Sequence, residues 1–256
     1  MSDKISERIP STERREQILD AASRVFGERG YFGATTDQIA KAAGISQPYV
    51  VRMFGGKENL FLGVLSRCLD RLLVAFTETL EQWKADGSPA EPLAGYATAA
   101  GSPAEPLAGH ATAAGAPAAP PGDLAAPTSA GGHGEIGRRL GLAYVSLVED
   151  RGLLLVLMQA FSMGHDPTIG AQARAGFLTI YRLLRAEAGF TPEQTRAFLA
   201  EGMLLNTLLG LRLPDSYDED EAARELLECT FRTKLDLVLH LAAEADHGRA
   251  AGAQRA

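Results

Sequence analysis

The feature that most constrains the fold of this chain is a pair of short helical segments joined by a glycine near its N-terminus. Thr35 is followed by Gln38 three residues later, which matches a capping box and predicts that a short helix starts directly after Thr35. Gly44 suits the turn that ends this helix. Ser46 is predicted to cap a second helix that runs to about Phe54. Two short helices separated by such a turn predict a helix-turn-helix unit.

An amphipathic segment at residues 11–29 precedes this unit and is predicted to be a third helix, with Gly30 in a left-handed position after its end. Its apolar stripe consists of Ile18, Leu19, Ala22, Val25 and Phe26. We expect the three helices to share a small core made of Phe26, Ile39, Ala40, Ile45, Val50 and Phe54. That core leaves the outer face of the last helix free, with Gln47, Pro48, Tyr49 and Arg52.

The rest of the chain also shows helical periodicity, and no strand pattern competes with it, so the predicted fold class is all-α. A long helix is expected from Lys57 to Lys84. The later helices are expected at about Glu135–Glu149, Gly152–Met163, Pro167–Ala188, Pro192–Leu211 and Glu219–Glu244.

A low-complexity segment at residues 86–134 interrupts the helical pattern. It contains eight of the chain's 13 prolines, together with 16 alanines and nine glycines. Residues 87–100 and 101–114 are a tandem repeat that differs only at Tyr96 and His110. This composition predicts a disordered insert, because it offers too little apolar surface to form a core. The insert is interpreted as a tolerated loop, with a lid or a tether for a protein partner as alternatives.

The charge of the chain does not exclude nucleic acid as a partner. The formal net charge is −7, but residues 1–66 carry nine Lys/Arg and eight Asp/Glu, so this part has a net charge of +1 and the rest of the chain has −8. Binding to phosphates needs a local basic face and not a basic average.

Several other classes of protein find no support in the sequence. No apolar run is long enough for a transmembrane helix, and Met1–Pro10 lacks the apolar segment of a signal peptide, so we expect a cytoplasmic protein. Cys68 and Cys229 are interpreted as reduced structural thiols, with a redox switch as the alternative. No histidine pair has metal-ligand spacing and no glycine-rich phosphate loop is present. We therefore expect no catalytic residue, no metal and no cofactor.

The first 62 or so residues resemble the DNA-binding domain of the TetR family of transcriptional regulators. The resemblance rests on Arg15-x-x-Ile18-Leu19-x-Ala21-Ala22, Phe26-x-x-x-Gly30-Tyr31, Thr35-x-x-x-Ile39-Ala40-x-x-Ala43-Gly44-Ile45-Ser46 and Phe54-x-x-Lys57-Glu58-x-Leu60-Phe61. It implies an N-terminal DNA-binding domain and a C-terminal helical domain that binds a small effector and forms a homodimer. The expected divisions are a helix-turn-helix domain at 1–56, a connecting helix at 57–85, the insert at 86–134, the helical ligand-binding and dimerisation domain at 135–246 and a flexible tail at 247–256.

The residues of the helix-turn-helix unit have physical reasons to contact double-stranded DNA. Gln47 can pair with adenine and Arg52 with guanine or a phosphate, and Pro48 and Tyr49 can contact a thymine methyl group. The family uses the lysine that corresponds to Lys57 on a phosphate, whereas no DNA role is expected for Val51 or Met53, which depart from the family pattern. The expected DNA-binding set is Arg14, Thr35, Thr36, Ser46, Gln47, Pro48, Tyr49, Arg52 and Lys57.

The C-terminal half is expected to enclose an effector and to form the dimer. Asn206 stands in an apolar context, and its amide needs a partner, which is a ligand, a symmetry-related asparagine or a neighbouring helix. The composition suits an apolar or aromatic effector, and no cationic cluster indicates an anionic one. The expected effector-binding residues are Phe76, Trp83, Tyr144, Met158, Phe161, Phe177, Tyr181, Met203 and Asn206. The expected dimer surface contains Met203, Leu204, Leu208, Leu211, Leu226, Leu227, Phe231, Leu235, Leu237 and Leu241.

The predicted function is a homodimeric transcriptional repressor that a small, largely apolar effector releases from a palindromic operator. An activator is the alternative for the sign of regulation. The rival functions are an all-α ligand carrier or enzyme that has kept the fold, and a DNA-binding regulator that a protein partner controls through the insert.

Overall fold

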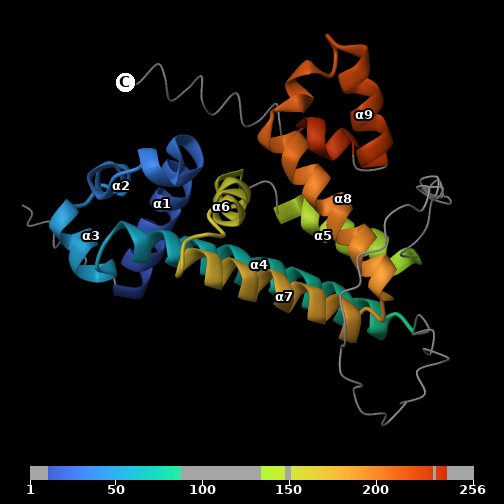
Figure 1. Ribbon diagram of the computed structural model, residues 1–256, viewed down its shortest axis with the longest axis horizontal. Helices are drawn as coiled ribbons and strands as arrows, with labels where there is room; N and C mark the ends of the chain where they lie inside the picture. The colour runs from blue at the N-terminus through green and yellow to red at the C-terminus, as the bar shows by residue number, and fades with distance from the viewer. Residues whose placement is uncertain (1–10, 88–133, 148–150, 233–234, 241–256) are drawn as a thin grey trace, which may run out of the picture.

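The computed structural model describes residues 11–87, 134–147, 151–232 and 235–240, and this part of the chain is helical and contains no strand (Figure 1). The all-α prediction is therefore confirmed. The predictions for the insert and for the tail at 247–256 lie outside the described residues. The helices are α1 (Ser11–Gly33), α2 (Thr36–Ala42), α3 (Gln47–Phe54), α4 (Lys57–Ala85), α5 (Gly134–Leu147), α6 (Arg151–Ser162), α7 (Ile169–Ala186), α8 (Pro192–Gly210), the 3-10 helix η1 (Leu213–Ser216) and α9 (Glu221–Phe231).

The first three helices form as their local signals predict. The Thr35 hydroxyl accepts a hydrogen bond from the Gln38 amide, and the Gln38 side chain accepts one from the Thr35 amide, which completes the capping box. Gly30 and Gly44 have φ values of 70° and 66°, the left-handed region that favours glycine. Ser46 takes the N-cap position of α3, but its side chain makes no capping hydrogen bond, so that part of the prediction is wrong.

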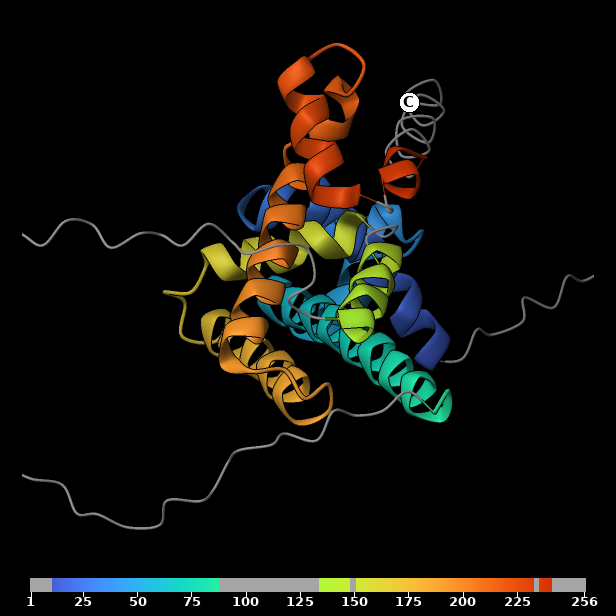
Figure 2. The ribbon, with the colours of Figure 1, turned by 90° about the vertical axis from the view of Figure 1, so that its right-hand side faces the viewer.

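One hydrophobic core runs from the N-terminal helices into the C-terminal half. Figure 1 shows α4 extending from α3 along the molecule beside α7, with α5 and α8 above this pair, and Figure 2 shows α5 next to α4. The buried cluster begins with Ile18 on α1, continues along α4 and ends with Phe190 after α7. Ile39, Ala40, Val50 and the other predicted core residues of the helix-turn-helix unit belong to it, with Ile45 partly buried against it.

Helix α6 packs directly against α1 through two glycines. A Cβ atom on Gly27 would lie 3.0 Å from the Gly152 Cα atom, and one on Gly152 would lie 2.9 Å from the Ser23 carbonyl oxygen. A hydrogen bond also joins the two helices: the Nε2 atom of Gln159 on α6 donates to the carbonyl oxygen of Phe26 on α1 over 2.9 Å. The C-terminal half therefore contacts the helix-turn-helix unit backbone to backbone at α1.

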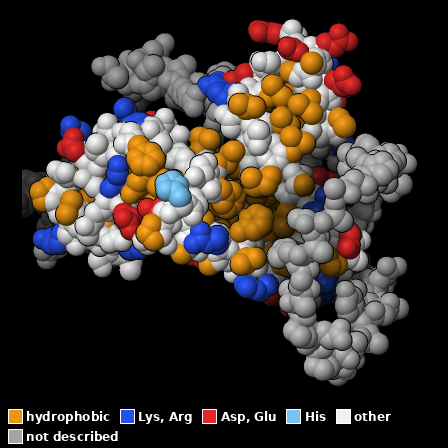
Figure 3. Space-filling view, viewed as in Figure 1, with side chains coloured by type: hydrophobic (Ala, Val, Ile, Leu, Met, Phe, Trp, Pro, Cys, Tyr) orange, Lys and Arg blue, Asp and Glu red, His pale blue; other side chains and the backbone are white. Residues whose placement is uncertain are grey.

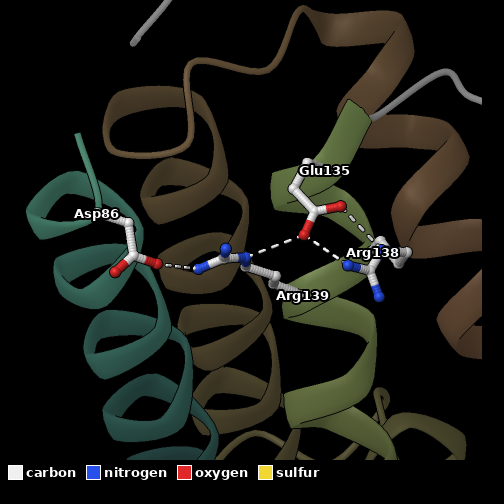
Figure 4. A network of polar contacts seen from close by, with 4 residues as sticks. All are labelled: Asp86, Glu135, Arg138 and Arg139. Carbon is white, nitrogen blue, oxygen red and sulfur yellow. Dashed lines mark hydrogen bonds and ion pairs between the residues drawn. The ribbon is translucent and has the colours of Figure 1, made fainter. Parts of the chain in front are cut away.

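A network of charged side chains joins the end of α4 to the start of α5 (Figure 4). Arg139 donates to Asp86 over 2.6 Å and to Glu135 over 3.1 Å, and Arg138 pairs with the same Glu135. The arginines hold the pKa of the Glu135 carboxyl below its usual range, through hydrogen bonds and then through their charge. The two described ends that flank residues 88–133 are thus tied to each other.

The last predicted helix, Glu219–Glu244, is not continuous. Helix α9 ends at Phe231, and Arg232 has a φ of 48°, a left-handed conformation that interrupts the helix. Residues 235–240 are helical again, and residues 241–244 lie outside the described part. No glycine or proline indicates this break, so helical periodicity alone does not detect it.

The predicted dimer stripe on α8 and α9 divides into a buried part and an exposed part. Leu208, Leu227 and Phe231 are buried in a second hydrophobic cluster between these helices. Leu204, Leu211 and Leu226 are instead exposed, and Figure 3 shows hydrophobic side chains gathered over α8 and α9. Leu241 lies outside the described residues. None of the helices in the described ranges is both long and apolar enough to cross a membrane.

Candidate nucleic-acid interface and ligand cavity

The start of α3 presents polar groups on an exposed surface. Gln47 and Pro48 occupy its first turn and are exposed. The Gln47 Nε2 atom donates a hydrogen bond of 3.0 Å to the hydroxyl of Thr36, the first residue of α2. Two of the predicted DNA-binding residues are therefore joined across the turn. This bond does not use the Gln47 Oε1 atom, which can therefore accept a hydrogen bond from a base edge.

Tyr49 and Arg52 form a second pair on the same helix. The Arg52 guanidinium lies 5.0 Å from the centre of the Tyr49 ring, which is the geometry of a cation–π contact. Arg52 is exposed, whereas Tyr49 is partly buried against the core. The ring thus holds the guanidinium of a last-turn residue of α3 while leaving it accessible.

Lys57 at the start of α4 lies over the ring of Tyr31, a residue outside the expected DNA-binding set. Its Nζ atom is 4.7 Å from the centre of the Tyr31 ring. Burial, followed by the charge of Glu58, raises the pKa of the Tyr31 hydroxyl above its usual value, so the ring stays uncharged. Tyr31 does belong to the Phe26-x-x-x-Gly30-Tyr31 motif, and this motif is the sequence signal that could have indicated its role. The Tyr31 ring compensates in part for the unfavourable place of a cation at a helix N-terminus.

The remaining cationic candidate, Arg14, lies on α1 and not on the helix-turn-helix unit itself. Its Nη1 atom donates to the Gln17 Oε1 atom over 3.0 Å, and Gln17 in turn donates to the Ala43 carbonyl oxygen over 2.8 Å. Gln17 was not predicted, and it anchors α1 to the end of α2. Arg15 next to it lies over the Phe54 ring at 5.0 Å. Contact of Arg14 with DNA stays a prediction.

In the C-terminal half, the partner of Asn206 is a neighbouring helix. The Tyr144 hydroxyl on α5 donates a hydrogen bond of 2.6 Å to the Asn206 Oδ1 atom. Burial raises the pKa of Tyr144 far above its usual range, so this hydroxyl stays protonated as a donor. Phe76 on α4 packs beside it, with its ring centre 6.4 Å from that of Tyr144. Of the three alternatives for Asn206, the structure supports the neighbouring helix.

A small cavity lies between α4, α5 and α6, with a volume of about 30 Å³. Tyr144 is the only predicted effector residue among those that line it; the others are Cys68, Arg71, Leu72, Leu147, Leu153, Leu154 and Leu157. The leucines of α6 recur at the spacing that any buried helix requires. Helical periodicity therefore cannot distinguish a residue that lines the cavity from one that packs in the core. A space of this size holds about one water molecule, which means that a larger ligand requires movement.

The other predicted effector residues lie at different contacts. The rings of Phe161 and Phe177 pack edge to face at 5.8 Å between α6 and α7. Met158 lies against Gly210 at the end of α8. Trp83, Tyr181 and Met203 are half-buried on α4, α7 and α8. Of the predicted effector residues, Tyr144 lines the cavity, and Phe76 and Asn206 contact Tyr144. Effector contacts for the whole set stay predictions.

Comparison with known proteins identifies the N-terminal domain. Residues 18–64 match the family described as bacterial regulatory proteins, tetR family. The N-terminal domain of this chain is therefore similar to the DNA-binding domain of that family. The matched residues extend from the middle of α1 into α4 and so contain the whole helix-turn-helix unit.

Two curated regulators resemble a part of this chain. The transcriptional activator FasR from Mycolicibacterium smegmatis is 45% identical over 73 residues, 28% of this chain and 33% of FasR. The transcriptional repressor AcnR from Corynebacterium glutamicum is 39% identical over 67 residues, 26% of this chain and 36% of AcnR. The chain thus matches about a third of the length of these relatives.

Among solved structures, a TetR-like transcriptional regulator from Rhodococcus sp. RHA1 aligns over 94% of this chain and 100% of its own, at 20% identity and a TM-score of 0.49.

Proposed function

We propose that this protein is a sequence-specific, DNA-binding transcriptional regulator that acts as a homodimer and responds to a small ligand. The observation that carries the proposal is the exposed face of α3, where Thr36 holds Gln47 in the first turn and Tyr49 holds Arg52 of the last turn. The match of this domain to the TetR family supports the same proposal.

The residues of α3 have distinct roles in the proposed complex. Gln47 reads an adenine edge, while Pro48 and Tyr49 contact a thymine methyl group in the major groove. Arg52 reaches a guanine or a phosphate, and Lys57 a phosphate. The DNA backbone on either side of α3 is contacted by Thr35, Thr36, Ser46 and Arg14. In this arrangement the backbone contacts fix the register and the α3 side chains supply specificity.

The proposed dimer forms through α8 and α9. The exposed Leu204, Leu211 and Leu226 on these helices support it, because symmetric pairing of one apolar face on both subunits is the usual route to a homodimer. A dimer places two α3 helices about one DNA turn apart, or a multiple of it, and so calls for a palindromic operator. We place this regulator in the cytoplasm, where its DNA is.

The proposed response is repression that a small, largely apolar effector relieves by favouring a dimer whose α3 spacing no longer fits the two half-sites. FasR is named as an activator and AcnR as a repressor, so the domain occurs with both signs of regulation. A reporter gene behind the operator, with and without the regulator, decides between them.

The central test is fluorescence anisotropy on the DNA that flanks the protein's own gene. We expect specific binding that weakens steeply with salt, because cations on the protein displace counterions from the phosphates. Gln47→Ala should relax discrimination at one base pair by about 1–3 kcal/mol per half-site. Gln82→Ala, an exposed glutamine at the far end of α4, is the matched control. Equal weakening of all sequences by Gln47→Ala contradicts base readout.

Two rival functions remain as outcomes of this test. Absence of specific binding at any salt concentration favours an all-α ligand carrier or enzyme. Specific binding that no small molecule alters, but that depends on the insert, favours a regulator controlled by a protein partner.

A further inference from the structure

The side chains of Thr36 and Gln47 form a hydrogen-bonded pair between α2 and α3, which lie next to each other at one end of the molecule (Figure 1). The Gln47 Nε2 atom donates to the Thr36 Oγ1 atom over 3.0 Å. Gln47 is exposed in the first turn of α3, and Thr36 is half-buried at the start of α2. The pair is therefore accessible on the surface that faces DNA in the proposed complex.

The packing of α2 against α3 fixes the separation of the two partners. Ile39 on α2 and Val50 on α3 are buried in the same hydrophobic core. Threonine is branched at Cβ, so the Thr36 hydroxyl has few rotamers. Gln47 has a long side chain that loses rotamer freedom when a partner holds it. Thr36 thus orders Gln47 before DNA binds, which lowers the entropy cost of the complex.

The direction of this hydrogen bond decides which groups of Gln47 face a base. A hydroxyl group can both donate and accept, whereas a phosphate oxygen only accepts. In the proposed complex Thr36 donates its proton to a phosphate, so only its lone pairs are left for Gln47. The Gln47 amide must then offer an N–H group to Thr36, as it does in the structure. This orientation leaves the Oε1 atom and the second Nε2 proton for the base edge.

The charges beside the pair do not prevent a phosphate from reaching Thr36. Asp37 is the next residue of α2, and its carboxylate alone would repel a phosphate. The Lys41 Nζ atom lies 2.8 Å from this carboxylate, one turn further along the same helix. The ion pair leaves no net charge beside the Thr36 hydroxyl.

We propose that Thr36 is a positioning residue for sequence readout, because its hydroxyl links a DNA phosphate to the Gln47 amide and turns the Gln47 Oε1 atom toward adenine. In the major groove adenine offers an amino group to this acceptor and N7 to the second Nε2 proton, whereas guanine offers two acceptors. A phosphate contact alone carries no sequence information, so this role goes beyond the backbone contact proposed for Thr36. The inference rests on the proposed function in one respect, namely that α3 enters the major groove.

Operators with altered bases test the orientation of Gln47 on the unchanged protein. The relevant base pair is the one at which Gln47→Ala loses discrimination, and we expect an A·T pair there. Replacing its adenine by purine, which keeps N7 but lacks the amino group, should weaken binding at least about threefold in fluorescence anisotropy. Gln47→Ala lacks the amide and is the control for the weaker duplex, so it should bind both operators equally. A preference for a G·C pair, or equal binding of adenine and purine by the unchanged protein, overturns the proposal.

Two variants of Thr36 test the hydroxyl itself. Thr36→Val keeps the branched shape but frees the Gln47 amide to turn, and the preference for adenine over guanine should fall about tenfold per half-site. Thr36→Ser retains the hydroxyl and should retain most of the preference. Thr179→Val on α7 is the matched control, since this exposed threonine bonds to the Ala175 carbonyl oxygen of its own helix. Adding Thr36→Val to Gln47→Ala should cause no further loss of discrimination, because the two residues act as one unit.

The pattern of losses separates this inference from the proposed function. A preference that falls in Thr36→Val and persists in Thr36→Ser supports both. Equal weakening of all sequences by Thr36→Val, with the preference unchanged, assigns Thr36 a phosphate contact alone; it overturns the inference and leaves the regulator standing. Absence of specific binding by the unchanged protein contradicts the proposed function and this inference together.

Discussion

The two ends of this protein are both helical, yet their helix boundaries differ in how plainly the sequence shows them. In the N-terminal half, α2 begins at the Thr35 capping box, and the turn before α3 contains the left-handed Gly44. In the C-terminal half, α8 and α9 also begin at local signals, the Thr191 capping box and the Asp220 cap, but α9 ends at Arg232, where no glycine or proline indicates the break. The difference shows that local capping chemistry can be recognised in a sequence, whereas breaks and contacts imposed by distant residues cannot.

The contact between the two halves should be the most sensitive point of the molecule. Gly152→Ala places a Cβ atom within 3 Å of Ser23 atoms, including its backbone oxygen, so the free energy of unfolding should fall by about 1–3 kcal/mol, as in other overpacked sites. Urea unfolding measures it. Gly202→Ala on α8, where the nearest atom to the new Cβ is 3.9 Å away, should instead be neutral or stabilising, by up to about 1 kcal/mol. Equal effects would mean that the backbone contact is not tight.

Within the C-terminal half, the next largest effect should come from the buried pair of Asn206 and Tyr144. Asn206→Ala removes the acceptor of the Tyr144 hydroxyl, and we expect a loss of about 1–3 kcal/mol in the free energy of unfolding. The double variant with Tyr144→Phe should be less than additive, since it removes both partners. Thr207→Ala, at an exposed neighbour, is the control. Strict additivity would contradict the hydrogen bond.

Two residues in cap positions test how much a local signal contributes in the N-terminal half. Thr35→Ala removes a capping hydrogen bond and should lower the free energy of unfolding by about 1 kcal/mol. Ser46→Ala removes a side chain that makes no capping bond, and its effect should stay within about 0.5 kcal/mol. Differential scanning calorimetry of both variants provides the comparison, and a larger loss for Ser46→Ala would reverse this assignment.

The smallest effect should follow from deleting residues 88–132. The ion pair between Asp86 and Arg139 already joins the flanking helices, and the entropy of loop closure changes by only about 0.6 kcal/mol for each doubling of loop length. We expect operator affinity and effector affinity to change less than twofold. A marked loss of effector affinity alone would support the lid, and loss of a protein partner would support the tether.

The sequence therefore predicts the class of fold, the bounds of α2 and α3 and the exposed face of α3, because these depend on neighbouring residues. It does not predict the link between Arg67 and Asp20, since 47 positions separate the two in the chain. It also misses the role of Tyr31 beneath Lys57, and it leaves the partner of Asn206 open among three alternatives. Each depends on how helices pack, which periodicity leaves open.

The close approach of Gly27 and Gly152 also limits how this protein can be divided or recombined. A DNA-binding domain that is joined to its sensor domain by the polypeptide alone can be exchanged for another such domain. Here the surface of α1 is shaped to the backbone of α6, and the Phe26 carbonyl oxygen depends on Gln159 for its hydrogen bond. A chimera that keeps residues 11–56 with another sensor would therefore have to carry α6 along, or replace both glycines and Gln159 as a matched set.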